Sequence, residues 1–499
     1  MNATLGNKRG WRILRRLLLA AAILATLLAA FYAEEDWRGK RAWENYKREW
    51  EAKGEKLDWQ AYVPPSVPND QNFFTAPIFT NMLNGKIVML PYGNDGGPDI
   101  RPDAIQSGYA IYQKQMADLQ AWQNYYRHQT NADMAKRFPI TPQTQTPAAD
   151  VLFALSKLNS AVEELRQASR RPYANVPLNY EGGFNSVSSL LPVLAELKRC
   201  SQLLQLRAVA ELADGQSAKA LDDVKLFLYL NNSLRSSPFL ISHLVRMAIA
   251  NIALQPIWEG LAENKWSDEQ LVALDAELAK MDFLADYEFT MRGERAFAIA
   301  LFEYQRITRE MISRKPDTDS LITNKLTFMP SAYFYQNELA FARVQQQWIL
   351  PLVDQSNQIV APAALRQSLA AVQAQLKHYS PYKVQALMNL PAITSSVKKF
   401  AIIQSQVDLA RIACALERHR LTHGQYPETL DALAPQFIGK LPNDIINGQP
   451  LHYRRTGDGK FLLYSVGWNE TDDGGQIAFT KGGSVDRDQG DWVWQYPVK

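Results

Sequence analysis

The longest apolar run of the chain lies close to its N-terminus. Leu17–Ala33 contains no charged residue. A helix rises about 1.5 Å per residue, so this run spans roughly 26 Å, close to the thickness of a bilayer's hydrocarbon core. Basic residues precede the run and acidic residues follow it: Lys8, Arg9, Arg12, Arg15 and Arg16, then Glu34, Glu35 and Asp36. Because basic flanks stay in the cytoplasm, residues 1–37 are predicted to form a cytoplasmic tail and one membrane anchor, with everything after Ala33 exported.

A cleaved signal peptide is the alternative interpretation of the same run. The residues before Glu34 are Phe31-Tyr32-Ala33. Signal peptidases cleave after small residues, and the bulky side chain of Phe31 fits that requirement badly. We therefore expect an uncleaved anchor, with the membrane as a partner bound through Leu17–Ala33.

A mixed region follows the anchor, and residues 38–149 are predicted to form a stalk with many loops. Trp43, Tyr46 and Trp50 recur at helical spacing among charged residues, which is typical of an amphipathic helix. Such a helix either lies on the membrane surface or forms a solvated stalk. The glycine-rich stretch Tyr92–Pro102 lacks the Lys-Ser/Thr pair of a phosphate-binding loop and is expected to be a turn.

Helical periodicity dominates residues 150–394, which we interpret as a helical domain. Leu191–Ala213 and Ala218–Leu230 are predicted to form a helical pair. Ser267 and Gln270 have the spacing of a capping box, in which each side chain bonds the backbone of the other at a helix start. Small residues at the predicted contacts favour a tetratricopeptide-like hairpin. Because no repeat of fixed period is present, an irregular bundle is the interpretation we favour over a true repeat array.

The pattern changes near residue 395, where a long helix is followed by short strands. Glycine is the common residue at a helix end, so this helix is expected to end at Gly424. Asp458-Gly459 is a strong hairpin signal between the strands predicted at Leu451–Arg455 and Phe461–Val466. Residues 395–499 are therefore predicted to form an α+β domain. The predicted fold class is mainly α.

Motifs in this domain resemble those of the globular head of the major pseudopilin of type II secretion. They are His423-Gly-Gln-Tyr-Pro-Glu-Thr-Leu, Leu441-Pro-Asn-Asp, Asn447-Gly-Gln-Pro-Leu-His-Tyr, Tyr464-Ser-Val-Gly and Asp488-Gln-Gly-Asp-Trp. The resemblance implies a long helix packed on a small antiparallel sheet, and an acidic C-terminal loop that binds calcium. Three further stretches are Ala42-Trp-Glu-Asn-Tyr-Lys, Gln255-Pro-Ile-Trp-Glu-Gly-Leu and Arg292-Gly-Glu-Arg-Ala. With them, the whole chain also resembles membrane-anchored bacterial proteins that end in this module, which implies the bacterial inner membrane and a periplasmic body.

The N-terminus departs from the pseudopilin pattern. A pseudopilin carries a Gly-Phe processing site and a glutamate five residues into its apolar helix. Here the pair is Gly10-Trp11, and Arg15 stands at the position of the glutamate. Polymerisation through the N-terminal helix is therefore not expected, and the shared fold does not by itself carry the function.

The acidic loop after Val466 is the predicted calcium site. Carboxylates crowded in one loop repel one another, and a hard cation with oxygen ligands relieves that repulsion. By resemblance, Asp488 occupies the position of an acidic ligand, and Asp486, Asp472 and Asp473 are the further candidates. The alternative is a solvated acidic loop that is ordered only by the packing of tryptophans.

Two histidines, His419 and His423, are four residues apart near the end of the predicted helix. That spacing can place two imidazoles on one metal ion. No HExxH glutamate accompanies them, and cationic side chains also stabilise the end of a helix. Capping is the interpretation we favour.

Composition and charge exclude several classes of function. The chain has 54 basic and 51 acidic residues, a balance that argues against nucleic acid as a partner. Its two cysteines, Cys200 and Cys414, lie among apolar residues and are expected to be buried thiols. No combination of a nucleophile with a base, or of residues for a cofactor, is present as a motif.

Two functions remain open. The first is a non-catalytic, membrane-anchored envelope protein with a protein-interaction or scaffold role, linked to secretion or pilus-like assemblies. The alternative is an envelope hydrolase with a pocket in the helical region. Its polar groups would be Arg292, Glu294 and Arg295, a charged island within an apolar helix.

Overall fold

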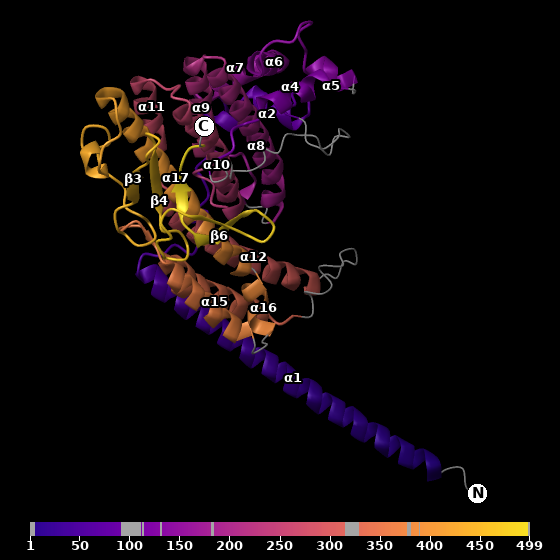
Figure 1. Ribbon diagram of the computed structural model, residues 1–499. Helices are drawn as coiled ribbons and strands as arrows, with labels where there is room; N and C mark the ends of the chain where they lie inside the picture. Colours follow the sequence, from indigo (N-terminus) through magenta and orange to yellow (C-terminus); the bar gives the residue numbers. More distant parts are fainter. Residues whose placement is uncertain are drawn as a thin grey trace. The chain divides into compact units, whose positions relative to one another are not determined.

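The computed structural model is mainly helical, with a long apolar helix at the N-terminus and a small sheet region at the C-terminus (Figure 1). This confirms the predicted predominance of helix. The residues described are 5–90, 111, 114–129, 132–180, 184–314, 329–376, 381–388 and 390–497. The predicted turn at Tyr92–Pro102 lies outside them.

The contacts within the chain define two compact units. Unit 1 comprises Met1–Ala61, Arg295–Gln347 and Leu369–Pro391. Unit 2 comprises Tyr62–Glu294, Trp348–Ser368 and Ala392–Lys499. These bounds differ from those of the four predicted segments. The segments stay a prediction, because a contact pattern does not test which parts fold independently.

Unit 1 is built around α1, one uninterrupted helix from Leu5 to Ala52. The helix α14, Ser331–Val344, runs parallel to it. The Ala332 N–H donates to Asp36 Oδ1, and the Tyr46 hydroxyl donates to the carbonyl of Ala342 at 3.1 Å. Both contacts join residues 296 positions apart, so the two helices keep one register over ten residues.

The second half of α12, Phe283–Arg314, lies antiparallel to α14 in unit 1. Phe302 contacts Phe341, Arg306 lies over the ring of Tyr335, and Arg309 Nη1 donates to Ser331 Oγ at 3.3 Å. The core between the three helices consists of Trp43, Tyr46, Leu57, Ile299, Leu339 and Ala342. The predicted amphipathic helix is therefore present, but its apolar face packs inside unit 1. It is neither a solvated stalk nor a membrane-surface helix.

Consecutive antiparallel helices form the helical part of unit 2. The predicted pair corresponds to α8, Phe184–Ala213, and α9, Ser217–Asn232, and both pack against α10, Leu240–Ala262. The capping box of Ser267 and Gln270 is present at the start of α11, Asp268–Leu278. Shorter helices are α2 Pro77–Leu83, α4 Leu119–Arg127, α5 Ala132–Arg137, α6 Pro147–Ala154, α7 Asn159–Ala168, α15 Pro362–Leu376 and, in unit 1, α16 Pro381–Met388. The tetratricopeptide-like arrangement stays a prediction.

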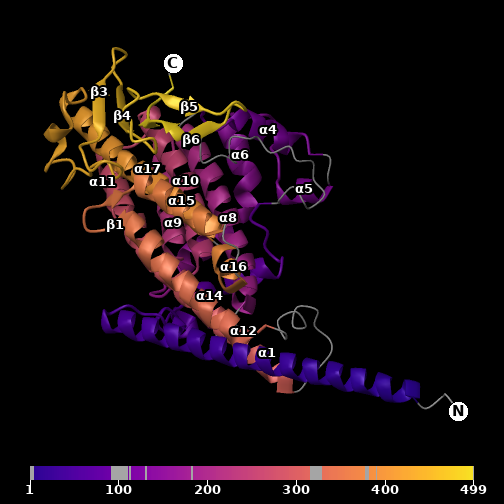
Figure 2. The same cartoon turned by 90° about the horizontal axis from the view of Figure 1, so that it is seen from below.

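The C-terminal part of unit 2 combines a long helix with short strands (Figure 2). The helix α17, Leu390–His423, ends as predicted at Gly424, whose φ of 77° requires the freedom of glycine. The strands are β1 Val353–Asp354, β2 Ile359–Val360, β3 His452–Arg455, β4 Phe461–Ser465, β5 Ile477–Phe479, β6 Val485–Gly490 and β7 Trp492–Trp494. The antiparallel order β3-β4-β7 forms one sheet, and β5 pairs with β6.

The hairpin between β3 and β4 confirms the turn predicted at Asp458-Gly459. His452 pairs with Tyr464, Arg455 pairs with Phe461, and Gly459 has a φ of 76°. A single 3-10 turn, Leu430–Leu433, lies between α17 and this hairpin.

Tyr426 joins α17 to the sheet. Its hydroxyl donates to Glu417 Oε2 at 2.9 Å, and its ring lies 4.9 Å from the ring of Phe461 on β4. Leu416, next to Glu417 on α17, is fully buried. The core of this part of the chain therefore lies between the end of α17 and the β3-β4-β7 sheet.

Truncation of Leu416 to alanine is expected to lower the free energy of unfolding by about 2–5 kcal/mol, because it leaves a cavity in that core. Leu421, on the same helix, is exposed, so Leu421→Ala serves as a matched control with an expected change below about 0.5 kcal/mol. Urea unfolding followed by tryptophan fluorescence measures both variants. Equal, small effects would mean that this face of α17 packs less tightly than described.

Candidate functional site

The apolar stretch of α1 is uncovered by the rest of the described chain. Two helices are long and apolar enough to cross a membrane, α1 and α10. The most apolar window of α10 is 72% buried, as in the core helix of a soluble domain, whereas that of α1 is 0% buried. The exposed side chains of α1 include Leu17, Leu24 and Phe31. A contiguous apolar surface of this size marks an interaction site, and α1 is the candidate anchor.

The predicted calcium ligands Asp486 and Asp488 lie on β6. Asp488 forms an ion pair with Lys398 of α17, 2.5 Å apart, and Asp486 Oδ1 accepts the N–H of Asp488 at 2.9 Å. The ammonium of Lys398 therefore occupies the partner position that a cation would take at Asp488. This contact joins the loop to the long helix.

The other predicted ligands, Asp472 and Asp473, belong to the turn before β5. Asp472 Oδ1 accepts the N–H of Gly474 at 2.9 Å and the hydroxyl of Tyr464 at 3.1 Å, and these bonds lower the pKa of Asp472. Asp473 Oδ2 accepts the side-chain amide of Asn469 at 2.8 Å. Both carboxylates thus bind protein donors.

Asp491 organises the same turn, although it was not among the predicted ligands. Its carboxylate accepts the N–H of Asp473 at 3.2 Å and that of Gly475 at 2.6 Å. Burial raises its pKa. Among the residues described, no group of three or more His, Cys, Asp or Glu side chains is placed to hold a metal ion. The calcium site therefore stays a prediction from the resemblance.

The Leu441-Pro-Asn-Asp motif has a structural role through its last residue. Asp444 is buried, and its carboxylate accepts the N–H groups of Ile446 and Val466 and the hydroxyl of Ser465, each at 2.9 Å. These bonds satisfy backbone donors at the point where β4 ends. The motif fixes the end of the strand and presents no free carboxylate.

The two histidines of α17 act as helix-end groups. His419 Nδ1 bonds the carbonyl of Gln425 at 3.0 Å, and His423 Nδ1 bonds that of His419 at 3.1 Å. A carbonyl only accepts, so each Nδ1 carries the proton. The stacked rings lie 4.2 Å apart and contact Phe437. This geometry agrees with the capping interpretation.

The side chains of the charged island have partners in different elements. Arg292 pairs with Glu288 at 2.6 Å, and Glu294 Oε1 accepts the N–H of Leu240 at the start of α10. Burial raises the pKa of Glu294 to about 7. In unit 1, Arg295 is buried and pairs with Glu55. The three residues proposed for a hydrolase pocket therefore serve packing and capping.

A cavity of about 270 Å³ lies elsewhere in unit 2. Its lining consists of Met116, Ala117, Leu119, Val209, Leu212, Ala213, Glu259, Glu263 and Lys265. Burial raises the pKa of Glu259 to about 7, and its Oε1 accepts the N–H of Ala117 at 2.8 Å. Among the residues described, the lining holds two carboxyl groups, of Glu259 and Glu263, beside Lys265, and it includes no serine, cysteine or histidine.

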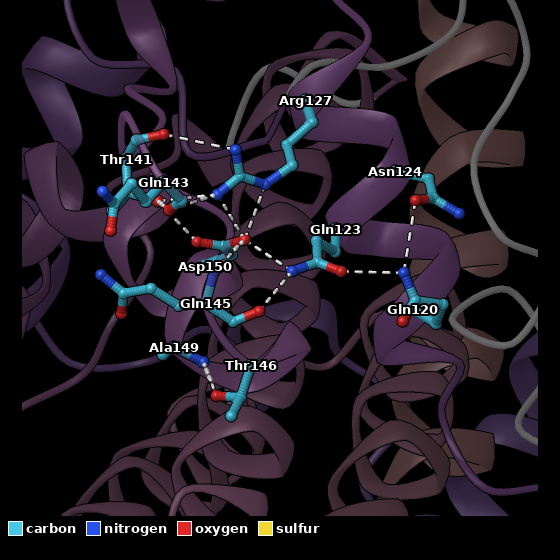
Figure 3. A network of polar contacts seen from close by, with 10 residues as sticks. All are labelled: Gln120, Gln123, Asn124, Arg127, Thr141, Gln143, Gln145, Thr146, Ala149 and Asp150. Carbon is cyan, nitrogen blue, oxygen red and sulfur yellow. Dashed lines mark hydrogen bonds and ion pairs between the residues drawn. The ribbon is translucent and has the colours of Figure 1, made fainter.

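A buried polar network surrounds Asp150 on α6 (Figure 3). Asp150 Oδ2 accepts from Arg127 Nε at 2.7 Å and from Gln123, and Oδ1 accepts the hydroxyl of Thr141 at 2.8 Å. Burial opposes ionisation, but the hydrogen bonds of Thr141, Gln123 and Arg127 outweigh it and lower the pKa of Asp150. Because its oxygens are engaged, the network joins α4 to α6 and offers no reactive group.

Comparison with protein-family models, with curated proteins and with solved structures found no match. The pseudopilin resemblance of residues 395–494 accordingly stays a prediction. The fold and the exposed apolar helix define a mainly helical chain with a candidate membrane anchor and a small C-terminal sheet region.

Proposed function

We propose that the protein is a membrane-anchored envelope protein that acts by binding other proteins. In this proposal the N-terminus is cytoplasmic, Leu17–Ala33 cross the bacterial inner membrane once, and the body is periplasmic. One observation carries the proposal. The helix α1 continues without a break from its exposed apolar stretch into the core of unit 1, where Trp43 and Tyr46 are buried. A bilayer that contains the apolar stretch of α1 therefore also anchors unit 1, because both belong to the same helix.

A scaffold role is supported by how the polar groups of the chain are used. The charged residues singled out by the sequence, Glu294, Arg295 and Asp472 among them, bind backbone or oppositely charged groups. These contacts stabilise the fold and leave little for acid–base chemistry. The pseudopilin-like motifs after residue 395 favour a partner in a secretion or pilus-like assembly.

Site-specific photo-crosslinking in cells tests this proposal. Phe479 on β5 and Val272 on α11 are both exposed, so each can carry a photoreactive residue without disturbing the fold. We expect the probe at Phe479 to give a discrete adduct with an envelope protein of a secretion or pilus-like assembly. The probe at Val272 is the control for the helical region. Adducts at neither position, with both variants present in the membrane fraction, would contradict a protein-binding role.

An envelope hydrolase is the second candidate, and the cavity at Glu259 is the observation that favours it. A carboxyl group with a pKa of about 7 can act as a general acid or base near neutral pH. If the cavity is an active site, chromogenic ester, phosphate or glycoside substrates should be hydrolysed, and Glu259→Gln should abolish that activity. Hydrolysis that survives in Glu259→Gln would place the activity elsewhere.

Calcium binding is the remaining prediction from the resemblance. We expect millimolar calcium to raise the melting temperature of the full chain in detergent through the acidic loop after Val466, and Asp488→Ala to remove the effect. Lys398→Ala should strengthen binding, because the Lys398 ammonium otherwise pairs with Asp488. Calorimetry that detects no heat for the wild type or for Lys398→Ala would contradict the calcium site.

A further inference from the structure

We propose that the C-terminal end of α12 in unit 1 enters the outer interface of the lipid bilayer beside α1, with Tyr304, Ile307 and Met311 in contact with lipid. This inference rests on the proposed membrane anchor. It adds that part of the folded body, and not α1 alone, contacts the membrane.

The parallel register of α1 and α14 sets the height of unit 1 above the bilayer. The acidic residues that follow Ala33 mark the edge of the apolar stretch. Asp36 accepts the N–H of Ala332, so α14 begins at this same level. Gly39 faces the start of α14, where a Cβ would be in ordinary van der Waals contact with Ala332, 3.4 Å away. The start of α14 is therefore close to the membrane surface.

Because α12 packs antiparallel to α14, the C-terminal end of α12 lies at the bilayer. Arg309 bonds Ser331, so Arg309 lies at the level where α14 begins. The helix α12 continues to Arg314. At about 1.5 Å per residue, Met311 lies roughly 3 Å beyond Arg309 towards the apolar stretch, at the level of Ala33. Ile307 and Tyr304 lie roughly 3 and 8 Å on the other side of Arg309, within the headgroup layer.

The side chains at these three positions suit a lipid interface. Tyr304, Ile307 and Met311 are 56%, 43% and 67% exposed, and their spacing of three and four residues places them on one face of α12. Tyrosine is enriched at the headgroup level, where its ring is apolar and its hydroxyl remains hydrated. Trp37, on α1 just beyond the acidic residues, is exposed at the same height. Because the register of the helices places this exposed face of α12 at the membrane surface, the bilayer is the partner that covers it.

A second methionine provides a matched control. Met388 at the end of α16 is 73% exposed, nearly the same as Met311. The Ala386 N–H donates to Asn337 Oδ1 at 3.2 Å, so this end of α16 lies beside the middle of α14. Asn337 is five residues along α14 from Ala332, so this end of α16 lies roughly 8 Å further from the bilayer than Asp36 does.

The experiment measures the depth of single fluorescent labels on the full chain in vesicles of phosphatidylethanolamine and phosphatidylglycerol. The buried Cys200 and Cys414 are replaced by alanine to remove background labelling. Met311→Cys, Met388→Cys and, within the anchor, Leu27→Cys are labelled with a polarity-sensitive dye. Quenching by lipids that carry a nitroxide on the headgroup reports contact with the interface, and an Ile307→Cys variant repeats that measurement. Quenching by lipids that carry the nitroxide along the acyl chain reports insertion at Leu27, which lies in the hydrocarbon core.

We expect the labels at Met311 and Ile307 to be quenched several-fold more than the label at Met388. Quenching at Leu27 with equal, weak quenching at Met311, Ile307 and Met388 would overturn the inference and leave the anchor intact. A protected environment at Met311 without lipid quenching would indicate a protein partner and would also overturn it. Absence of quenching at Leu27 would overturn the anchor itself, and the inference with it.

Discussion

Replacing Asp286 by alanine is expected to lower the free energy of unfolding by about 3–5 kcal/mol, because it leaves a buried cation without its counter-charge. Arg246 is 0% exposed, and its Nη1 lies 2.5 Å from Asp286 Oδ2. The principal remaining partner is the carbonyl of Asn231, which accepts from Arg246 Nε at 3.0 Å. A guanidinium in so apolar a place is tolerated only with a carboxylate beside it.

Two comparisons separate this effect from the loss of an ordinary ion pair. Glu277 and Lys280 form a partly exposed pair near the end of α11, so Glu277→Ala should cost less than about 1 kcal/mol. Replacing both members of the buried pair, Arg246→Met with Asp286→Leu, should recover most of the loss, since no buried charge is then left unpaired and Arg235, the other partner of Asp286, is half exposed. Chemical unfolding measures all three variants. Similar costs for Asp286→Ala and Glu277→Ala would contradict the buried pair.

Asp408 is expected to make stability depend on pH. It lies on α17, where its Oδ1 accepts from Gln404 Nε2 at 3.1 Å, and burial raises its pKa from 3.8 to about 7. The folded chain therefore holds this proton more tightly than the unfolded chain does. The stabilisation from the proton is complete below about pH 4 and is lost as pH rises towards 7, by roughly 4 kcal/mol in all.

Asp408→Asn removes this dependence because the amide keeps a neutral side chain of the same shape. We expect the variant to unfold like the wild type at about pH 4.5 and to be more stable by roughly 3–4 kcal/mol at about pH 8. Comparison with the wild type at each pH cancels the other titrating groups, including His243, whose pKa is lowered to about 3 by burial. A difference that does not change with pH would contradict a buried, protonated Asp408.

Local features of the fold were predictable from the sequence because neighbouring residues decide them. The apolar run Leu17–Ala33, the capping box at Ser267 and the turn at Asp458-Gly459 each depend on a few adjacent side chains. Periodicity identified Trp43 and Tyr46 as one face of a helix. It could not identify the partner of that face, because α14 lies almost 300 residues later in the chain.

The acidic loop shows the same limit at the candidate site. The composition of the loop showed a cluster of carboxylates, and the pseudopilin resemblance predicted that Asp488 is a calcium ligand. Neither revealed that Lys398, on a distant helix, pairs with Asp488, or that Asp491 binds the backbone of the turn. The charged island at Arg292 was the pocket considered for the alternative hydrolase function, whereas the buried carboxyl that lines a cavity is Glu259. The role of a charged side chain depends on contact partners that are distant in sequence, and a single sequence does not show which residues those partners are.

Protease digestion of spheroplasts tests the membrane anchor most directly. The proposed topology predicts that protease added outside the inner membrane digests the body after Ala33. A short N-terminal fragment that contains Leu17–Ala33 should remain with the membrane after carbonate extraction. Full protection of the C-terminal domain, while a known periplasmic protein in the same sample is degraded, would contradict the proposed topology. Release of the intact chain by carbonate would contradict the anchor.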